Sequence, residues 1–391
     1  MDFLFEAKNI REELVKWRRD FHAHPELGYQ EVRTSLVIKE FLLKENIEFY
    51  DTATTGICAI IRGKGEKTVG IRGDMDALPL MEKNSCDYIS KNLGTMHACG
   101  HDAHTAILMG VAKILNSIKH QLEGNVKLFF EPAEETTGGA RVMIEEGVLK
   151  NPSVDAVIGL HVDEKIEVGY IGLKKGVVNA ASNPFTVKVK GRGGHGAHPN
   201  DCVDPVVISS QIIIALQTIV SREIAPTDAA VITIGSIHGG TAPNIIPEEV
   251  IITGVIRTMK IEDRAYVKKR LKEVAEGIAL SMRGSCVIEI EESYPCLYNS
   301  DELVKVFKKS ASRIIGEKNI IALDKPSMGV ESFAYFAMEK PSVFYFLGSR
   351  NEKKGIIHPA HGSHFDIDEE CLPIGVALQC EMTVELLKKI K

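Results

Sequence analysis

The sequence lacks the close cysteine pairs that mark a disulfide scaffold. Its eight cysteines are scattered through 391 residues, without a CxxC pair or any other short, repeated spacing. A chain of this length buries a core without such cross-links, so we interpret the cysteines as mostly reduced thiols. This pattern predicts a cytoplasmic protein.

A long apolar run and an excess of positive charge are also missing. The most apolar window, residues 206–220, is interrupted by serine and glutamine, and the N-terminus has no basic start before an apolar stretch. We therefore expect neither a membrane span nor a signal peptide. The 47 Lys and Arg residues against 53 Asp and Glu give a net charge of −6, which argues against a nucleic-acid partner.

The hydrophobic periodicity predicts an α/β fold. Apolar residues recur at helical spacing over 10–21 and 32–41, and strands and helices alternate after that. Such alternation is typical of a doubly wound, mostly parallel sheet. The expected strands are 68–72, 125–130, 154–160 and 342–347, and the expected helices are 103–118, 141–146 and 333–338.

The middle of the chain breaks this alternation. Its expected elements are a strand at 185–190, a helix at 205–222, strands at 230–237 and 250–258, a helix at 261–282 and a strand at 286–291. The order βαββαβ is that of a ferredoxin-like α+β domain. We therefore predict an inserted domain of residues 184–294 within a discontinuous larger domain made of 1–183 and 295–391.

Residues that bind metal ions follow the predicted strands of the larger domain. Asp76 follows one strand, Glu134 and Glu135 follow the next, His161 ends a third, and HACGHDAH at 97–104 opens a helix. Because the functional crevice of an open α/β sheet lies outside the carboxyl ends of its strands, we expect these residues to lie close together. The sequence therefore predicts a metal site at this edge.

The residue types at this edge indicate hydrolytic chemistry. Thiolate, imidazole and carboxylate are ligands of Zn²⁺, and also of Mn²⁺, Co²⁺ or Ni²⁺. Of two adjacent carboxylates, one can bind the ion while its neighbour takes a proton from water, and Asp76 can orient a ligand imidazole. We expect His104 to support the site or pack in its helix, and His22 and His24 to lie at the surface.

Longer motifs resemble those of the M20 metallopeptidase/aminoacylase superfamily. GDMDALPL, MHACGHDAHTA, EPAEET and GLHV occur in the order of its amidohydrolase branch, which includes hippurate hydrolase-like and indoleacetyl-amino-acid hydrolase-like enzymes. GRGGHGAHP, GGTAPNIIP and HGSHFDIDEE extend the resemblance to the C-terminus. It implies an enzyme with two divalent metal ions that hydrolyses the amide bond of small N-acyl-L-amino acids.

The resemblance also implies individual residue roles. Glu134 would be the general base, and Asp76 would orient the cluster. The inserted domain would be a dimerisation lid, so that the chain forms a homodimer or a higher homo-oligomer. His195 of the lid would polarise the scissile carbonyl in a neighbouring active site, while Asn244 and Arg257 would hold the substrate carboxylate. The implied metal ligands are Cys99, which would bridge the two ions, His101, Glu135, His161 and His361.

Two departures from the family pattern affect the site. The segment HPAHGSH offers three histidines for the C-terminal ligand, of which we choose His361 because it lies four residues before Phe365. His358 is the alternative, and His364 is the least favoured. Ser332 stands where the family usually has Asp.

Two other functions stay open from the sequence. An exo- or dipeptidase would use the same scaffold and differ only in the groups around the scissile amide. A thiol hydrolase would use Cys99 as its nucleophile with a nearby histidine.

Overall fold

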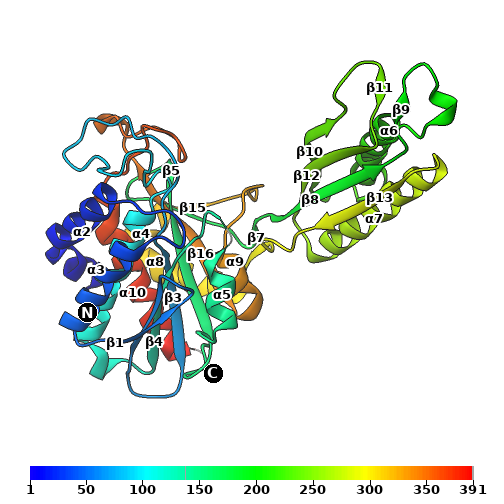
Figure 1. The fold of residues 1–391 in the computed structure, drawn as a ribbon. Helices are drawn as coiled ribbons and strands as arrows, with labels where there is room; N and C mark the ends of the chain where they lie inside the picture. Colours follow the sequence, from blue (N-terminus) through cyan, green and yellow to red (C-terminus); the bar gives the residue numbers. More distant parts are fainter. Residues whose placement is uncertain (137, 390–391) are drawn as a thin grey trace. The chain divides into compact units, whose positions relative to one another are not determined.

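The computed structural model of the chain describes residues 1–136 and 138–389, which form two compact units (Figure 1). The first unit comprises Met1–Val178, Tyr298–Lys325 and Glu331–Lys391. The second comprises Asn179–Leu297 and Pro326–Val330, so the predicted insertion, residues 184–294, falls inside it. The chain leaves the first unit in β7 (Gly176–Asn179) and returns in β14 (Leu297–Asn299).

The first unit is built on an eight-stranded sheet with the order β1-β2-β4-β3-β5-β16-β6-β15 (Figure 1). The pairings among β4, β3, β5 and β16 are parallel, which agrees with the α/β prediction. The pairs β1–β2, β2–β4 and β6–β16 are antiparallel, so the sheet as a whole is mixed. The strands are β1 (Glu48–Thr52), β2 (Gly56–Ile61), β3 (Thr68–Asp74), β4 (Asn125–Glu131), β5 (Ala156–Glu167), β6 (Ile171–Leu173), β15 (Ile320–Ala322) and β16 (Ser342–Arg350).

Helices cover both faces of this sheet. Side chains alternate between the faces of a strand, so Leu128 and Phe130 of β4 point to the same side, where they join a core with residues of α4 and α10. Phe129 points to the other side and stacks on Phe336 of α9, with ring centroids 5.0 Å apart. The helices of this unit are α1 (Phe3–Asn9), α2 (Arg11–Ala23), α3 (Val32–Lys44), α4 (His101–Ser117), α5 (Gly139–Glu145), α8 (Asp301–Ile315), α9 (Phe333–Glu339) and α10 (Cys371–Lys389).

The second unit has the predicted ferredoxin-like topology. Its antiparallel sheet has the order β10-β12-β8-β13, and its helices α6 and α7 pack on one face through residues such as Ile212 and Leu271. The elements follow as β8 (Ala181–Lys190), α6 (Pro205–Thr218), β10 (Ala230–Gly239), β12 (Glu249–Thr258), α7 (Ile261–Ser281) and β13 (Ser285–Ile290). This order confirms the βαββαβ prediction.

One helical segment, Pro205–Glu223, is long and apolar enough to cross a membrane by length and composition alone. It comprises α6 and the π-helical turn that follows. Core helices of globular domains meet the same criteria. Ile208, Ile212 and Leu216 of this segment are buried in the core of the second unit, whereas Val206, Val207 and Ile214 are exposed.

Candidate metal centre

The segments that follow β3 and β4 lie side by side at one edge of the sheet. The two strands run parallel, and their last residues, Asp74 and Glu131, are paired. The chain beyond them stays adjacent, because the backbone N–H of Glu135 donates a hydrogen bond of 2.9 Å to Asp76 Oδ2. The structure thus joins two of the motifs that the sequence places at this edge.

His161 reaches the same edge from within a strand rather than from the end of one. We expected its strand to end near residue 160, but β5 continues to Glu167 because it keeps its pairing with β16, in which His161 lies opposite Phe346. The pairing of β5 with β3 ends at Gly159. His161 therefore lies where β5 extends past its neighbour and its side chain is open to the site.

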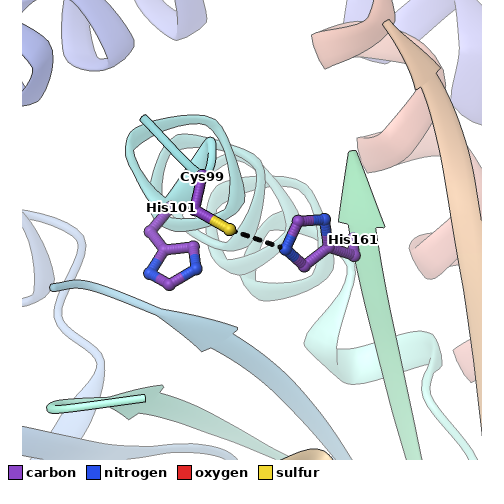
Figure 2. A group of neighbouring side chains, drawn as sticks. All are labelled: Cys99, His101 and His161. Atoms are coloured by element: carbon purple, nitrogen blue, oxygen red, sulfur yellow. Dashed lines mark hydrogen bonds between the residues drawn. The ribbon is translucent and has the colours of Figure 1, made fainter. Parts of the chain in front are cut away.

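Cys99 and His161 are direct neighbours (Figure 2). The Cys99 Sγ atom lies 3.3 Å from His161 Nε2. His161 Nδ1 lies 2.6 Å from the carbonyl oxygen of Val162, so it carries the ring proton and donates it there. This hydrogen bond leaves the lone pair of Nε2 free toward Cys99, which is the arrangement of a metal-binding imidazole.

A glycine with a left-handed backbone separates Cys99 from His101. Gly100 has φ +87°, and a Cβ atom at this position would lie 2.3 Å from Val162 Cγ2. Helix α4 begins at the next residue, so His101 is its first residue and Cys99 lies just before the helix (Figure 2). His101 Nδ1 contacts Asp76 Oδ1 at 3.2 Å.

The adjacent carboxylates Glu134 and Glu135 have different partners. Glu134 Oε1 accepts a hydrogen bond of 3.0 Å from the backbone N–H of Ser332. Glu135 Oε1 lies 3.2 Å from His361 Nε2. The turn before them contains Ala133 at φ +54°, whose N–H donates to a buried glutamate, Glu31, at 2.8 Å. The turn thus directs the two carboxylates to different neighbours.

His361 is the histidine of HPAHGSH that the structure brings to this cluster. Its backbone N–H donates a hydrogen bond of 2.7 Å to the carbonyl oxygen of Ala98, directly before Cys99. The backbone of His361 is left-handed, with φ +61°. His358 and His364 instead contact each other, with ring centroids 5.3 Å apart.

These side chains form overlapping groups of metal donors. The donor atoms of Cys99, His101 and His161 lie within 4.8 Å of one another, and so do those of Cys99, Glu135 and His361. Cys99 belongs to both groups, so a single sulfur atom can contact two ions. His101 Nε2 is buried and has no hydrogen-bond partner among the described residues, which fits a metal ligand better than a packed histidine.

The protonation of the cluster reflects its burial. Burial raises the pKa of the Cys99 thiol well above its usual range, so a thiolate here needs a cation beside it. Burial, together with the charges of Glu331 and Glu135, raises the pKa of Glu134 well above its usual range. Although burial opposes it, the hydrogen bond with His361 and the charge of His101 lower the pKa of Glu135 to about 2. The two adjacent glutamates therefore differ in basicity as well as in their partners.

A buried arginine that we had not singled out from the sequence forms ion pairs with carboxylates next to the cluster. Arg72 in β3 lies 2.7 Å from Asp74 Oδ2, 2.6 Å from Glu131 Oε2 and 2.9 Å from Glu331 Oε1. It also donates to Ser332 Oγ at 2.8 Å. The one signal in the sequence is a lone arginine within the apolar run of the predicted strand.

Ser332, which stands in place of the usual Asp, completes this group. Its hydroxyl donates a hydrogen bond of 2.5 Å to Glu131 Oε1 and accepts the bond from Arg72. The backbone N–H of Ser332 donates a hydrogen bond to Glu134, so Ser332 connects Arg72 and its carboxylate partners to Glu134. A neutral side chain at this position places one carboxylate fewer around Arg72 than an Asp would.

The expectation that His22 lies at the surface was wrong. His22 is fully buried, with Nδ1 at 2.7 Å from Asp102 Oδ2 and Nε2 at 3.1 Å from Glu82 Oε1. Although burial and Arg18 oppose its charge, Asp102 and Glu82 raise the pKa of His22. The local sequence, with a proline three residues after His22, gave no sign of these distant partners. His24 is partly exposed.

His104 belongs to a third group of donors, with Asp74 and His101, but both of its ring nitrogens already have hydrogen-bond partners. Its Nδ1 lies 2.6 Å from Asp74 Oδ1, and its Nε2 accepts a hydrogen bond of 2.9 Å from the backbone N–H of Val162. Both ring nitrogens are therefore engaged in holding β3, α4 and β5 together.

The three remaining predicted site residues, His195, Asn244 and Arg257, lie in the second unit. His195 Nδ1 accepts a hydrogen bond of 3.1 Å from the N–H of Ala197, so its Nε2 carries a proton that it can donate. The backbone N–H of Gly196 donates to the carbonyl oxygen of Asn244 at 2.8 Å. Arg257 donates to the carbonyl oxygen of Met328 at 3.1 Å. Their roles in catalysis stay predictions.

Known proteins resemble the chain over nearly its whole length. The profile of Peptidase family M20/M25/M40 matches residues 70–385. IAA-amino acid hydrolase ILR1-like 4 of Arabidopsis thaliana is 37% identical over 97% of this chain and 86% of its own length. N-acetylcysteine deacetylase of Bacillus subtilis is 37% identical over 98% of this chain and 99% of its own.

Two further similarities bear on the chemistry. Thermostable carboxypeptidase 2 of Saccharolobus solfataricus is 37% identical, with both chains fully covered. The crystal structure of a dinuclear metal binding peptidase from the M20 family, the Bacillus subtilis YXEP protein, matches with a TM-score of 0.85 and 34% identity. The match covers 98% of this chain and 100% of that one.

The glycine before helix α4 gives a first test of the centre. Gly100→Ala adds a Cβ that collides with Val162, whereas Gly94, with a similar φ of +82°, has nothing within 4 Å of an added Cβ. We expect Gly94→Ala to lower the free energy of unfolding by about 1 kcal/mol and Gly100→Ala to lower it by a further ~1–3 kcal/mol. Gly100→Ala should also retain less metal after dialysis, as elemental analysis would show. Equal metal content in the two variants would contradict this account.

The buried arginine gives a second test. Arg72→Met leaves three buried carboxylates without their cation, which should lower the free energy of unfolding by about 3–5 kcal/mol in urea denaturation. The control is Arg62→Met, because Arg62 pairs with Glu48 where both side chains are more than half exposed. Its effect should stay within about 1 kcal/mol. Similar midpoints for the two variants would show that the ion pairs of Arg72 contribute little.

Proposed function

The chain belongs to peptidase family M20/M25/M40, and we propose that it hydrolyses the amide bond of N-acyl-L-amino acids. It is a metal-dependent amidohydrolase of the dinuclear type. The two overlapping donor groups that share Cys99 carry the proposal, because one cluster of side chains offers ligands for two adjacent ions. The names of the plant and Bacillus relatives support the substrate class.

We assign five side chains as metal ligands. Thiolate, imidazole and carboxylate suit Zn²⁺, Mn²⁺, Co²⁺ or Ni²⁺, and the donor set does not single out one of them. When bound, two such ions lower the pKa of a water molecule and polarise the acyl carbonyl. The residues that would hold the ions are Cys99, which would contact both of them, His101, Glu135, His161 and His361.

Glu134 is the proposed general base. It directly precedes the proposed ligand Glu135, lies within 4.8 Å of donor atoms of His101 and Glu135, and is oriented by the N–H of Ser332. From this position, Glu134 takes a proton from the attacking water and passes it to the leaving amine. Asp76 keeps His101 and the backbone of Glu135 in place through one oxygen each.

The second unit supplies the proposed substrate-binding residues. The free Nε2–H of His195 suits the developing oxyanion of the acyl carbonyl. The guanidinium of Arg257 can bind the substrate α-carboxylate through two parallel hydrogen bonds, and Asn244 adds an amide donor. We also propose that this unit mediates homodimerisation, since β10 pairs with only one strand in its sheet and leaves its other edge open.

We propose a cytoplasmic location and no nucleic-acid or membrane partner. All eight cysteines are free, which agrees with a reducing compartment. A reduced thiol is also what a metal-bridging role of Cys99 requires.

An exo- or dipeptidase activity is the second candidate. The thermostable carboxypeptidase is as similar to this chain as the deacetylase, so the scaffold is compatible with either leaving group. A thiol hydrolase based on Cys99 is less well supported, because the structurally similar peptidase binds two metal ions.

Matched substitutions can distinguish the role of the proposed general base, Glu134, from that of the neighbouring metal ligand, Glu135. Glu134→Gln keeps the ligand set and should lower kcat by about 10²–10⁴-fold with unchanged metal content. Glu135→Gln removes a ligand and should lower both metal content and activity. Elemental analysis alongside single-turnover assays distinguishes the two effects. An active Glu134→Gln enzyme would exclude Glu134 as the base.

A substrate panel with metal removal tests the activity itself. The purified protein should hydrolyse acetyl-, benzoyl- or succinyl-amino acids in preference to dipeptides. A chelator should abolish turnover, and a divalent ion should restore it. Turnover of dipeptides alone would establish the peptidase, whereas chelator resistance combined with inactivation by a thiol alkylator would establish the thiol hydrolase.

A further inference from the structure

Two histidines beside the proposed centre contact each other rather than the centre. His358 and His364 have ring centroids 5.3 Å apart and an angle of 40° between the rings. Both side chains are exposed. Among the described residues, neither ring forms a hydrogen bond or ion pair with another group that would use its nitrogens.

The backbone between these two histidines is held in place. The N–H of Gly362 donates to the carbonyl oxygen of Pro359 at 3.1 Å, and the N–H of Phe365 donates to that of Gly362 at 3.0 Å. Phe365 is buried, and the carbonyl oxygen of Ser363 accepts a hydrogen bond of 2.9 Å from the N–H of Lys83. His358 therefore lies just before, and His364 within, a pair of consecutive turns that a hydrogen bond from Lys83 holds in place.

The three histidines of the HPAHGSH segment point in two different directions. His361 is directed to Glu135 and binds Ala98 through its backbone. His358 and His364 flank it in the sequence and meet each other on the surface. Neither belongs to the donor groups of the centre, so their pairing is a separate feature of this chain.

We propose that His358 and His364 form an additional binding site for one divalent transition-metal ion. Neutral imidazole is a good ligand for Cu²⁺, Ni²⁺ and Zn²⁺, and two imidazoles on a pre-formed turn act as a chelate, with water completing the coordination. The Irving–Williams order ranks Cu²⁺ highest at such a site. Ca²⁺ and Mg²⁺ are disfavoured, since they prefer oxygen ligands.

If the two histidines chelate one ion together, replacing either one should weaken metal binding, whereas two independent histidines would each keep their own binding. Protein that holds its own metal would be dialysed against increasing Ni²⁺, and total metal per chain would be measured by elemental analysis. Ni²⁺ is chosen because it does not oxidise thiols as Cu²⁺ does. The wild type should take up one further ion per chain. His358→Gln and His364→Gln should each weaken this uptake by about tenfold or more, which corresponds to ~1.4 kcal/mol or more of binding free energy.

The double variant and a control complete the test. His358→Gln/His364→Gln should lose the further ion while keeping its metal at the centre and its hydrolytic activity, which also shows that it is folded. His120→Gln, which removes an exposed histidine elsewhere in the first unit, should bind Ni²⁺ as the wild type does. The proposal is overturned if the wild type takes up no further ion, or if either single variant binds it as tightly as the wild type. A failure of the centre itself would instead appear as missing metal in every variant.

Discussion

The ion pairs of Arg72 are the interaction on which the candidate centre depends. This one buried guanidinium contacts carboxylates from β3, from β4 and from the segment before α9. Three buried carboxylates this close together would repel one another and lose their hydration without a cation among them. Because β3 and β4 lead directly into the turns that carry Asp76 and Glu135, the arginine holds together the base of the proposed site.

The backbone of the site is strained where its functional residues are placed. Ala133 and His361 have left-handed backbones although neither is glycine, and Gly100 occupies the same region without strain. Each lies at or next to a residue of the proposed centre, and Ala133 and His361 are held by hydrogen bonds to Glu31 and Ala98. Strain of this kind persists only when surrounding contacts over-determine it. Here the left-handed backbones orient side chains from separate turns toward the proposed metal centre.

Much of this arrangement could be predicted from the sequence. Alternating apolar segments correctly indicated the central strands, the two layers of helices and the ferredoxin-like order of the second unit. The ligand-type residues of the first unit are indeed close together, because parallel strands deliver their carboxyl ends to one edge. The supporting charges could not be predicted in the same way. Arg72 and Ser332 are 260 residues apart, and no local pattern links them.

The His22 error has the same physical origin. Local sequence suggested a polar residue near a proline at the end of a helix, where surface exposure is usual. In the structure, the ring is enclosed by Asp102 and Glu82, from segments 80 and 60 residues away. A buried charge is tolerated only if such partners are present, and periodicity carries no information about partners so distant in the chain.

The sequence by itself determined the kinds of residue at the centre, their order and the fold that brings them together. These follow from residue chemistry and from the periods of helices and strands, which are local properties. Only the tertiary structure decided which histidine of HPAHGSH turns toward Glu135, which tautomer His161 adopts and which cation lies beneath the carboxylates. Those choices depend on hydrogen bonds and burial between distant segments, and they are defined only when the chain has folded.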